Sequence, residues 1–224
     1  MKQINKYIQE RLHINKDFKS YNYHPKTHDE LEELIDKLIK ERGNNANLND
    51  IDTSEITDMS YVFKNSEFNG DISEWDVSNV KTMEYMFYGS SFNGDISNWN
   101  VSNVKDMSSM FQYSKFNGDI SNWDVSNVKE MVSMFEESKF NGDISNWNVS
   151  NVEIMDSMFY HSKFNGDISK WNVSNVEYMS FMFYRSEFTG VNGDISNWDV
   201  SNVKDMESMF DKSPLEKNPP KWYK

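Results

Sequence analysis

The chain of 224 residues contains no cysteine, only four prolines and no apolar run that approaches the length of a membrane span. The lack of cysteine excludes disulfides, thiolate metal ligands and cysteine nucleophiles, and it agrees with a reducing compartment. A membrane-spanning helix needs about 20 consecutive apolar residues, and the first residues lack the apolar segment of a secretory signal. These absences predict a cytoplasmic protein, with display on the cell surface by an unconventional export route as the alternative.

Leucine is scarce, and the apolar residues are chiefly 15 Phe, 14 Met, 11 Tyr and 7 Trp. The mean hydropathy is low, at -0.79. A core must therefore be built from large aromatic or unbranched side chains.

Negative charge predominates and is concentrated in one region. Residues 44–213 hold 11 basic and 27 acidic residues, a net charge of -16, whereas residues 1–43 carry +1 and residues 214–224 carry +2. An acidic surface repels phosphate backbones and anionic lipids. Direct binding to nucleic acid or membrane is therefore not expected, and a protein with a basic surface is the expected partner.

A 24-residue period organises the acidic region. Its tryptophans are spaced by 24 residues four times and then by 27, and Ile51 takes the tryptophan position in a degenerate first copy. Such a period indicates a solenoid of stacked units. We therefore expect seven repeats in residues 44–213, between an N-terminal helical cap region (1–43) and a C-terminal capping tail (214–224). The tryptophans are Trp75, Trp99, Trp123, Trp147, Trp171 and Trp198.

Each repeat divides into two halves with different patterns, as the copy at residues 92–115 shows. Its second half has apolar residues at helical spacing, Val104, Met107, Met110 and Phe111, after a serine that could cap a helix. Its first half places Ile96, Trp99 and Val101 after an Asn-Gly turn, and the last two alternate as in a strand. The prediction is an α/β repeat solenoid with one short strand and one short helix per repeat.

The motif F-N-G-D-I-S-x-W-[DN]-V-S-N-V-x-x-M-x-x-M-F recurs six times nearly intact. It resembles the BspA-like, leucine-rich-repeat-related units of bacterial surface proteins and mycoplasma lipoproteins. The resemblance implies a right-handed, leucine-rich-repeat-like coil with a strand on one side and a helix on the other. It also implies adhesion or protein recognition, and no catalytic residues.

Both ends carry signals of caps, which an open stack requires. An amphipathic helix is predicted between Thr27 and Gly43. A second helical pattern covers residues 3–12, through Ile4, Tyr7, Ile8 and Leu12. At the other end three prolines stop the repeat, and Trp222 or Tyr223 is expected to fold back over the last coil.

An acidic column follows the Asn-Gly turns, and it admits two explanations. Carboxylates stacked at strand spacing would lie about 4.8 Å apart and would repel one another unless compensated. Calcium could compensate them. The favoured alternative is that backbone N–H groups of the turns and stacked Asn side chains do so. The column consists of Asp71, Asp95, Asp119, Asp143, Asp167 and Asp194.

A zinc site at His24, His28 and Asp29 is conceivable from spacing. Pro25 intervenes and Thr27 has the features of a helix cap, so the two histidines are expected to straddle a helix start. We expect neither a bound metal nor a cofactor. The sequence also shows no catalytic triad, phosphate-binding loop or carboxylate pair, and it predicts no enzyme.

Partner binding is expected where the repeats differ, because the positions required for stacking are alike in every copy. Tyrosine and arginine are favoured at interface hot spots. The alternative is that these aromatic residues pack helix ends against the neighbouring coil. Candidates near the predicted helices are Tyr88, Tyr113, Tyr160, His161, Tyr178, Phe181, Tyr184 and Arg185, and candidates on the predicted strand side are Asp76, Asp124 and Asp199.

The predicted function is that of a monomeric, non-enzymatic, protein-binding solenoid acting inside the cell. By analogy of charge and size with anti-CRISPR proteins, it could be a prophage-borne inhibitor of a basic nucleic-acid-binding effector such as an RNA-guided nuclease. The alternative, from the resemblance, is an adhesin or surface-recognition module.

Overall fold

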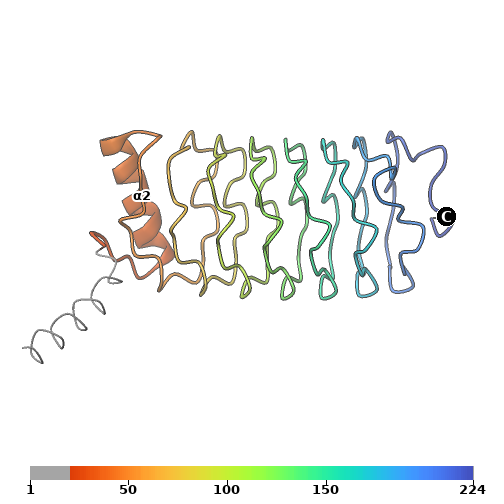
Figure 1. Ribbon diagram of the computed structural model, residues 1–224, viewed down its shortest axis with the longest axis horizontal. Helices are drawn as coiled ribbons and strands as arrows, with labels where there is room; N and C mark the ends of the chain where they lie inside the picture. The colour runs from red at the N-terminus through yellow and green to blue at the C-terminus, as the bar shows by residue number, and fades with distance from the viewer. Residues whose placement is uncertain (1–20, 224) are drawn as a thin grey trace, which may run out of the picture.

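The computed structural model describes residues 21–223, which form a single row of stacked coils (Figure 1). One helix, α2 (His28–Arg42), covers the first coil, and the C-terminal segment lies at the opposite end of the row. The solenoid predicted from the 24-residue period is confirmed. The helical pattern at residues 3–12 lies outside the described residues.

α2 forms where the sequence predicted a helix. The Thr27 side chain accepts the backbone N–H of Glu30, and Gly43 ends the helix by donating its N–H to the Ile39 carbonyl at 2.8 Å. Leu31, Ile35 and Leu38 are buried in the same core as the coils. α2 therefore shields the apolar end of the stack.

Successive coils are joined by parallel backbone pairing in one column of isolated bridges, which runs through Asp58, Thr82, Asp106, Glu130, Ile154, Tyr178 and Asp205. Beyond each bridge, alternate N–H groups point along the stack. Those of Met107, Ser109 and Phe111, for example, donate to carbonyls of the next coil at 3.0, 2.7 and 3.0 Å. These alternate N–H groups are thus satisfied between coils rather than within them.

The short helix predicted in every repeat is not formed, and among residues 21–223 α2 is the only helix. In the segment after each bridge the chain makes consecutive tight turns, such as the one closed by the Met110 N–H on the Met107 carbonyl. Residues Ser109 and Tyr113 have φ of 56° and 58°, which a right-handed helix does not allow. An apolar residue at every third position suits a turn of this kind as well as a helix, so the helix predicted from this spacing was wrong.

The short strand predicted around Trp99 and Val101 is also not formed as a paired strand, because side chains replace the backbone ladder there. The Trp99 indole N–H donates to the Ile72 carbonyl of the preceding coil at 3.2 Å, and Asn103 Nδ2 donates to the Ser78 carbonyl at 2.7 Å. The leucine-rich-repeat-like strand and helix are therefore absent from the described coils.

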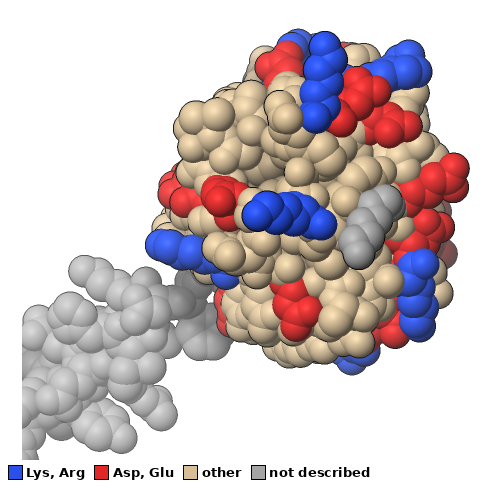
Figure 2. Space-filling model, turned by 90° about the vertical axis from the view of Figure 1, so that its right-hand side faces the viewer, with Lys and Arg blue, Asp and Glu red and all other residues tan. Residues whose placement is uncertain are grey.

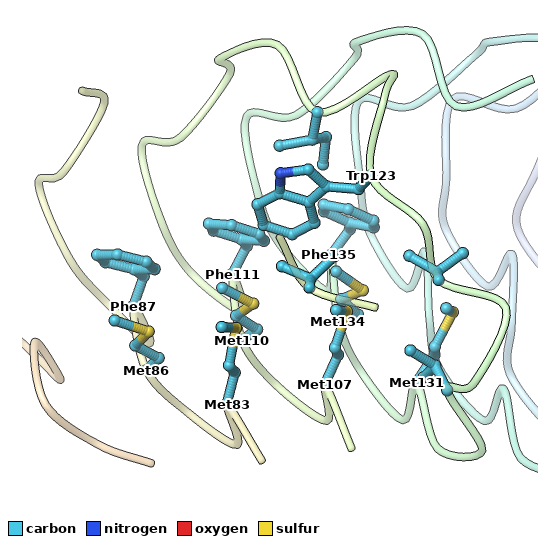
Figure 3. Close-up of a cluster of buried hydrophobic side chains, with 14 of the residues drawn as sticks. Met83, Met86, Phe87, Met107, Met110, Phe111, Trp123, Met131, Met134 and Phe135 are labelled. Carbon is cyan, nitrogen blue, oxygen red and sulfur yellow. The ribbon is translucent and has the colours of Figure 1, made fainter. Parts of the chain in front are cut away.

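The interior consists of columns of identical side chains (Figure 3). Phe87, Phe111 and Phe135 stack with ring centroids 5.6 and 5.8 Å apart, and all three are fully buried. Met110 and Met134 lie beside the rings in the same core. Because burying one such side chain stabilises a fold by roughly 1.5–3 kcal/mol, the columns are the main source of stability.

The tail after the last repeat covers the C-terminal end. Trp222 continues the tryptophan column, since its indole N–H donates to the Ile195 carbonyl at 2.9 Å and its ring lies 6.2 Å from that of Trp198. Tyr223 packs edge-on against Phe210 at 5.0 Å. Viewed from this end, most of the surface is uncharged (Figure 2). Both residues therefore fold back over the last coil, where the sequence predicted one or the other.

Candidate binding surface

Five of the positions that differ between coils lie together in the turn segment after each bridge. In the coil of residues 92–115, Met107, Met110 and Phe111 of this segment are fully buried. The other five positions, 106, 108, 109, 112 and 113, change identity from coil to coil. We call these five columns the variable face, and we name each column after its residue in this coil.

The eight candidates predicted near helices all belong to the variable face, although the helices themselves are absent. Column 106 contains Tyr178, column 109 contains Phe181, column 112 contains Tyr88, Tyr160 and Tyr184, and column 113 contains Tyr113, His161 and Arg185.

Columns 109 and 113 have left-handed backbone conformation in every coil, with φ between 48° and 66°. Glycine is the residue that adopts this conformation without cost, and other L-residues pay roughly 1–2 kcal/mol. Only Gly89 among the fourteen positions is glycine; the rest are Tyr61, Tyr85, Ser109, Ser133, Ser157, Phe181 and Ser208 in column 109, and Asn65, Tyr113, Glu137, His161, Arg185 and Lys212 in column 113. Side chains are thus retained on this face at an energetic cost.

The first three coils carry a cluster of four tyrosines, which we call the tyrosine cluster: Tyr61, Tyr85, Tyr88 and Tyr113. Tyr61 and Tyr85 stack at 5.1 Å, and Tyr85–Tyr88 and Tyr88–Tyr113 follow at 5.6 and 5.4 Å. Tyr61 and Tyr113 are 39% and 44% exposed. Tyr61 and Tyr85 were not among the predicted candidates, although they share a column with Phe181, which was.

A second aromatic group, the Tyr184 cluster, lies near the C-terminal end. The Tyr184 ring stacks on Tyr160 at 5.0 Å and meets Phe181 edge-on at 5.8 Å. Lys212 Nζ donates to the Tyr184 hydroxyl at 2.7 Å, and Arg185 lies over the ring at 5.6 Å. The hydrogen bond from Lys212 lowers the pKa of Tyr184. This cluster is therefore already occupied by cations of its own chain.

Carboxylates predominate on the variable face around the tyrosine cluster. The variable face of residues 68–139 contains five acidic residues and no basic one: Glu84, Asp106, Glu130, Glu136 and Glu137. Burial raises the pKa of Glu84, and repulsion by Asp106 and Glu130 adds to it. Burial is the main cause of the raised pKa of Tyr113, and the negative charges of Glu136 and Glu137 add to it. The negative charges of this region are thus incompletely compensated.

The acidic candidates Asp76, Asp124 and Asp199 lie elsewhere in the coil, directly after the tryptophan. Each accepts the backbone N–H of the serine two residues later, at 3.0, 3.1 and 3.0 Å. Asn100 does the same in its own coil at 3.2 Å. These aspartates therefore have a turn-stabilising contact that asparagine can replace, and they belong to a different segment from the aromatic clusters.

The acidic column after the Asn-Gly turns is compensated locally. Asp95 accepts the backbone N–H of Ser97 at 2.9 Å and its hydroxyl at 2.7 Å, and the backbone contact is the main cause of its lowered pKa. Beside it, the Asn93 N–H donates to Asn69 Oδ1 of the preceding coil at 2.7 Å. The contacts support the favoured explanation, in which turns and stacked asparagines stabilise the column.

The histidines proposed as possible zinc ligands pair with different carboxylates. His24 Nδ1 lies 3.2 Å from Asp52, and His28 Nε2 lies 4.0 Å from Glu32. Within residues 21–223, no group of three or more His, Asp or Glu side chains is arranged to hold a metal ion. Nor is any helix of this part of the chain both long and apolar enough to cross a membrane.

Comparison with known sequences places the repeat in a family. Residues 30–139 and 112–222 each match a family described as "Mycoplasma protein of unknown function, DUF285". This agrees with the resemblance to mycoplasma repeat proteins drawn from the motif. No curated protein and no solved structure matches the chain significantly. Because the two matches together extend over most of the sequence, the chain belongs to the Mycoplasma family DUF285.

Proposed function

We propose that the chain is a non-enzymatic protein-binding solenoid that presents its variable face to a partner. The observation that carries this proposal is the pair of left-handed columns. Thirteen of their fourteen residues are not glycine, and they include exposed tyrosine, arginine, histidine and lysine side chains. Residues other than glycine in sparsely populated backbone conformations cluster at functional sites.

The negative charge of the solenoid supports a partner with a basic surface. We propose that the two proteins meet inside the cell. The acidic solenoid would speed encounter with such a surface more than it would raise the final affinity. An inhibitor of an RNA-guided nuclease is the narrower form of this proposal, and it has charge and size in its favour.

An adhesin or surface-recognition module of the BspA-like type is the second candidate. The match to a mycoplasma family favours it, because the resemblance that predicted this function was to mycoplasma and bacterial surface repeats. Both candidates use the same kind of contact surface. Protease treatment of intact native cells separates them, since only a surface module would be cut.

The proposed function is tested by capturing partners from the native host with the wild-type chain and with a face variant, Phe181→Ser with Tyr113→Gly. Each new residue already occurs in the same column, at Ser157 and Gly89, so the fold should be kept. We expect the variant to lose a partner that the wild type retains.

The matched control changes Asp76→Asn and Asp124→Asn, since asparagine makes the same turn contact at Asn100. It should retain the partner. Equal retention by the face variant would refute the variable face as the binding surface.

A further inference from the structure

We propose that the tyrosine cluster is the docking site for lysine and arginine side chains of a basic segment of the partner protein. The inference rests on the proposed function and narrows it to one end of the variable face and to one chemistry.

The rings of the cluster form a continuous row across three coils, and they already accept a cation from their own chain. Lys64 Nζ lies 4.9, 5.3 and 5.4 Å from the ring centroids of Tyr61, Tyr85 and Tyr88. These distances are those of cation–π attraction. Lys64 thus shows that an ammonium group fits against these rings.

Only part of the row is used by Lys64. Within residues 21–223, no basic side chain lies over the ring of Tyr113 at the other end, and this ring is the most exposed of the row at 44%. Glu136 and Glu137 are the charges that act on its hydroxyl. A second cation would therefore find both a ring and negative charge at this end.

The carboxylates around the row make the site complementary to a cation rather than to an anion. Glu84 lies in the coil of Tyr85 and Tyr88, and the negative charges of Asp106 and Glu130 act on it. No basic residue occupies the variable face between residues 68 and 139. An approaching cation would relieve the repulsion among these carboxylates, which is a favourable electrostatic term for binding.

The Tyr184 cluster provides a contrast within the same face. Lys212 and Arg185 lie 5.1 and 5.6 Å from the Tyr184 ring, and Lys212 also binds its hydroxyl. A further cation would be repelled there. The Tyr184 ring thus holds two cations of its own chain, whereas Tyr113 of the tyrosine cluster holds none within residues 21–223, and we expect the tyrosine cluster to bind a basic segment more strongly.

A labelled hexa-arginine peptide serves as the probe, with hexa-glutamate as the opposite-charge control, and fluorescence anisotropy at low salt measures binding to the full chain. We expect wild type to bind hexa-arginine and not hexa-glutamate. Glu84→Gln with Glu130→Gln should weaken binding about fivefold or more, given the energies of partly exposed ion pairs. Tyr88→Gln, which introduces the residue found at Gln112, should weaken it about two- to fivefold through loss of cation–π attraction.

The matched control is again Asp76→Asn with Asp124→Asn, which removes two charges from another segment of the coil. It should change the dissociation constant less than twofold. Equal weakening by the control pair would show a diffuse charge effect and would overturn the site. An unchanged dissociation constant in Tyr88→Gln, with circular dichroism confirming the fold, would overturn the aromatic contribution.

Failure of this inference is distinguishable from failure of the proposed function. If the face variant loses its native partner while hexa-arginine binds wild type and the Glu84 variant equally, the binding face stands and its assignment to cations is wrong. If hexa-arginine binding depends on Glu84 and Tyr88 but no native partner depends on the variable face, the proposed function fails instead.

Discussion

Replacing serine by glycine in a left-handed column should stabilise the solenoid, against the usual effect of glycine. Ser133 and Ser157 have φ of 54° and 56°. Removing the β-carbon removes roughly 1–2 kcal/mol of backbone strain per residue from the folded chain. The greater conformational freedom of glycine in the unfolded chain offsets about 0.5–1 kcal/mol of that gain. The double variant Ser133→Gly, Ser157→Gly should therefore gain about 1–2 kcal/mol.

Thermal unfolding, monitored by circular dichroism, measures this gain in stability. For a chain of this length, 1 kcal/mol shifts the Tm by about 2–4 °C, so the double variant should melt about 2–8 °C higher. Two controls isolate the cause. The matched Ser→Ala pair keeps both β-carbons and should show no gain. Ser145→Gly lies outside the left-handed columns, in a turn where the Ser145 N–H donates to Asp143, and should lower the Tm.

A Tm for the double glycine variant at or below that of the double alanine variant would refute the reasoning. It would mean that these positions carry no backbone strain and that the variable face holds its side chains without an energetic cost. A gain confined to the glycine pair would support that argument without any knowledge of the partner.

Three further outcomes are expected. Phe135→Ala leaves a cavity in the fully buried phenylalanine column and should cost about 3–5 kcal/mol, measured by urea unfolding; a cost below 1 kcal/mol would contradict the packing described. Asp119 and Asp143 have pKa values lowered from 3.8 by the N–H groups of their turns, so their stabilisation is complete above pH 4 and is lost as the pH falls through the lowered values; Asp119→Asn with Asp143→Asn should flatten the pH dependence of the Tm in this range, and an unchanged slope would count against it. Trp222→Ala should speed amide hydrogen exchange in the last coil and leave the central coils unchanged, because the indole covers only that end; uniform acceleration would disprove a local cap.

Local compensation of charge explains why an acidic repeat can stack at all. The Asp column accepts N–H groups within its own turns, as Asp95 does from Ser97 at 2.9 Å. Glu84 of the variable face differs, since burial and the negative charges of Asp106 and Glu130 raise its pKa. Acidic residues therefore differ in their surroundings, since turn N–H groups favour the charged form of Asp95 whereas burial and neighbouring charges disfavour that of Glu84.

Much of the fold could be predicted from sequence because the same pattern of buried positions occurs in every repeat. The columns of Phe, Trp, Val and Met that the period defines are the columns that the structure buries. The helix between Thr27 and Gly43 could be read from its cap and its apolar face. The aromatic residues of the variable face could be found because they vary where the scaffold does not.

The helix and strand within each coil could not be predicted, because the same spacing of apolar residues suits both a helical turn and a tight turn. What decided between them was the neighbouring coil. The N–H groups of Met107, Ser109 and Phe111 donate to carbonyls of residues 23 positions later. A local sequence pattern does not indicate such long-range hydrogen bonds. The first half of the coil differed for a related reason, since the Trp99 indole and Asn103 amide take over the hydrogen bonds that a strand would have made.

The sequence by itself determined the stack, its number of coils, its buried columns and its two covered ends, because these follow from period, side-chain size and cap signals. Tertiary structure alone decided which backbone groups pair, which residues are strained, and that Tyr61, Tyr85, Tyr88 and Tyr113 form one surface. Residues 24 positions apart become neighbours only when coils stack, so the contacts of the variable face arise between repeats and are not encoded in any one of them.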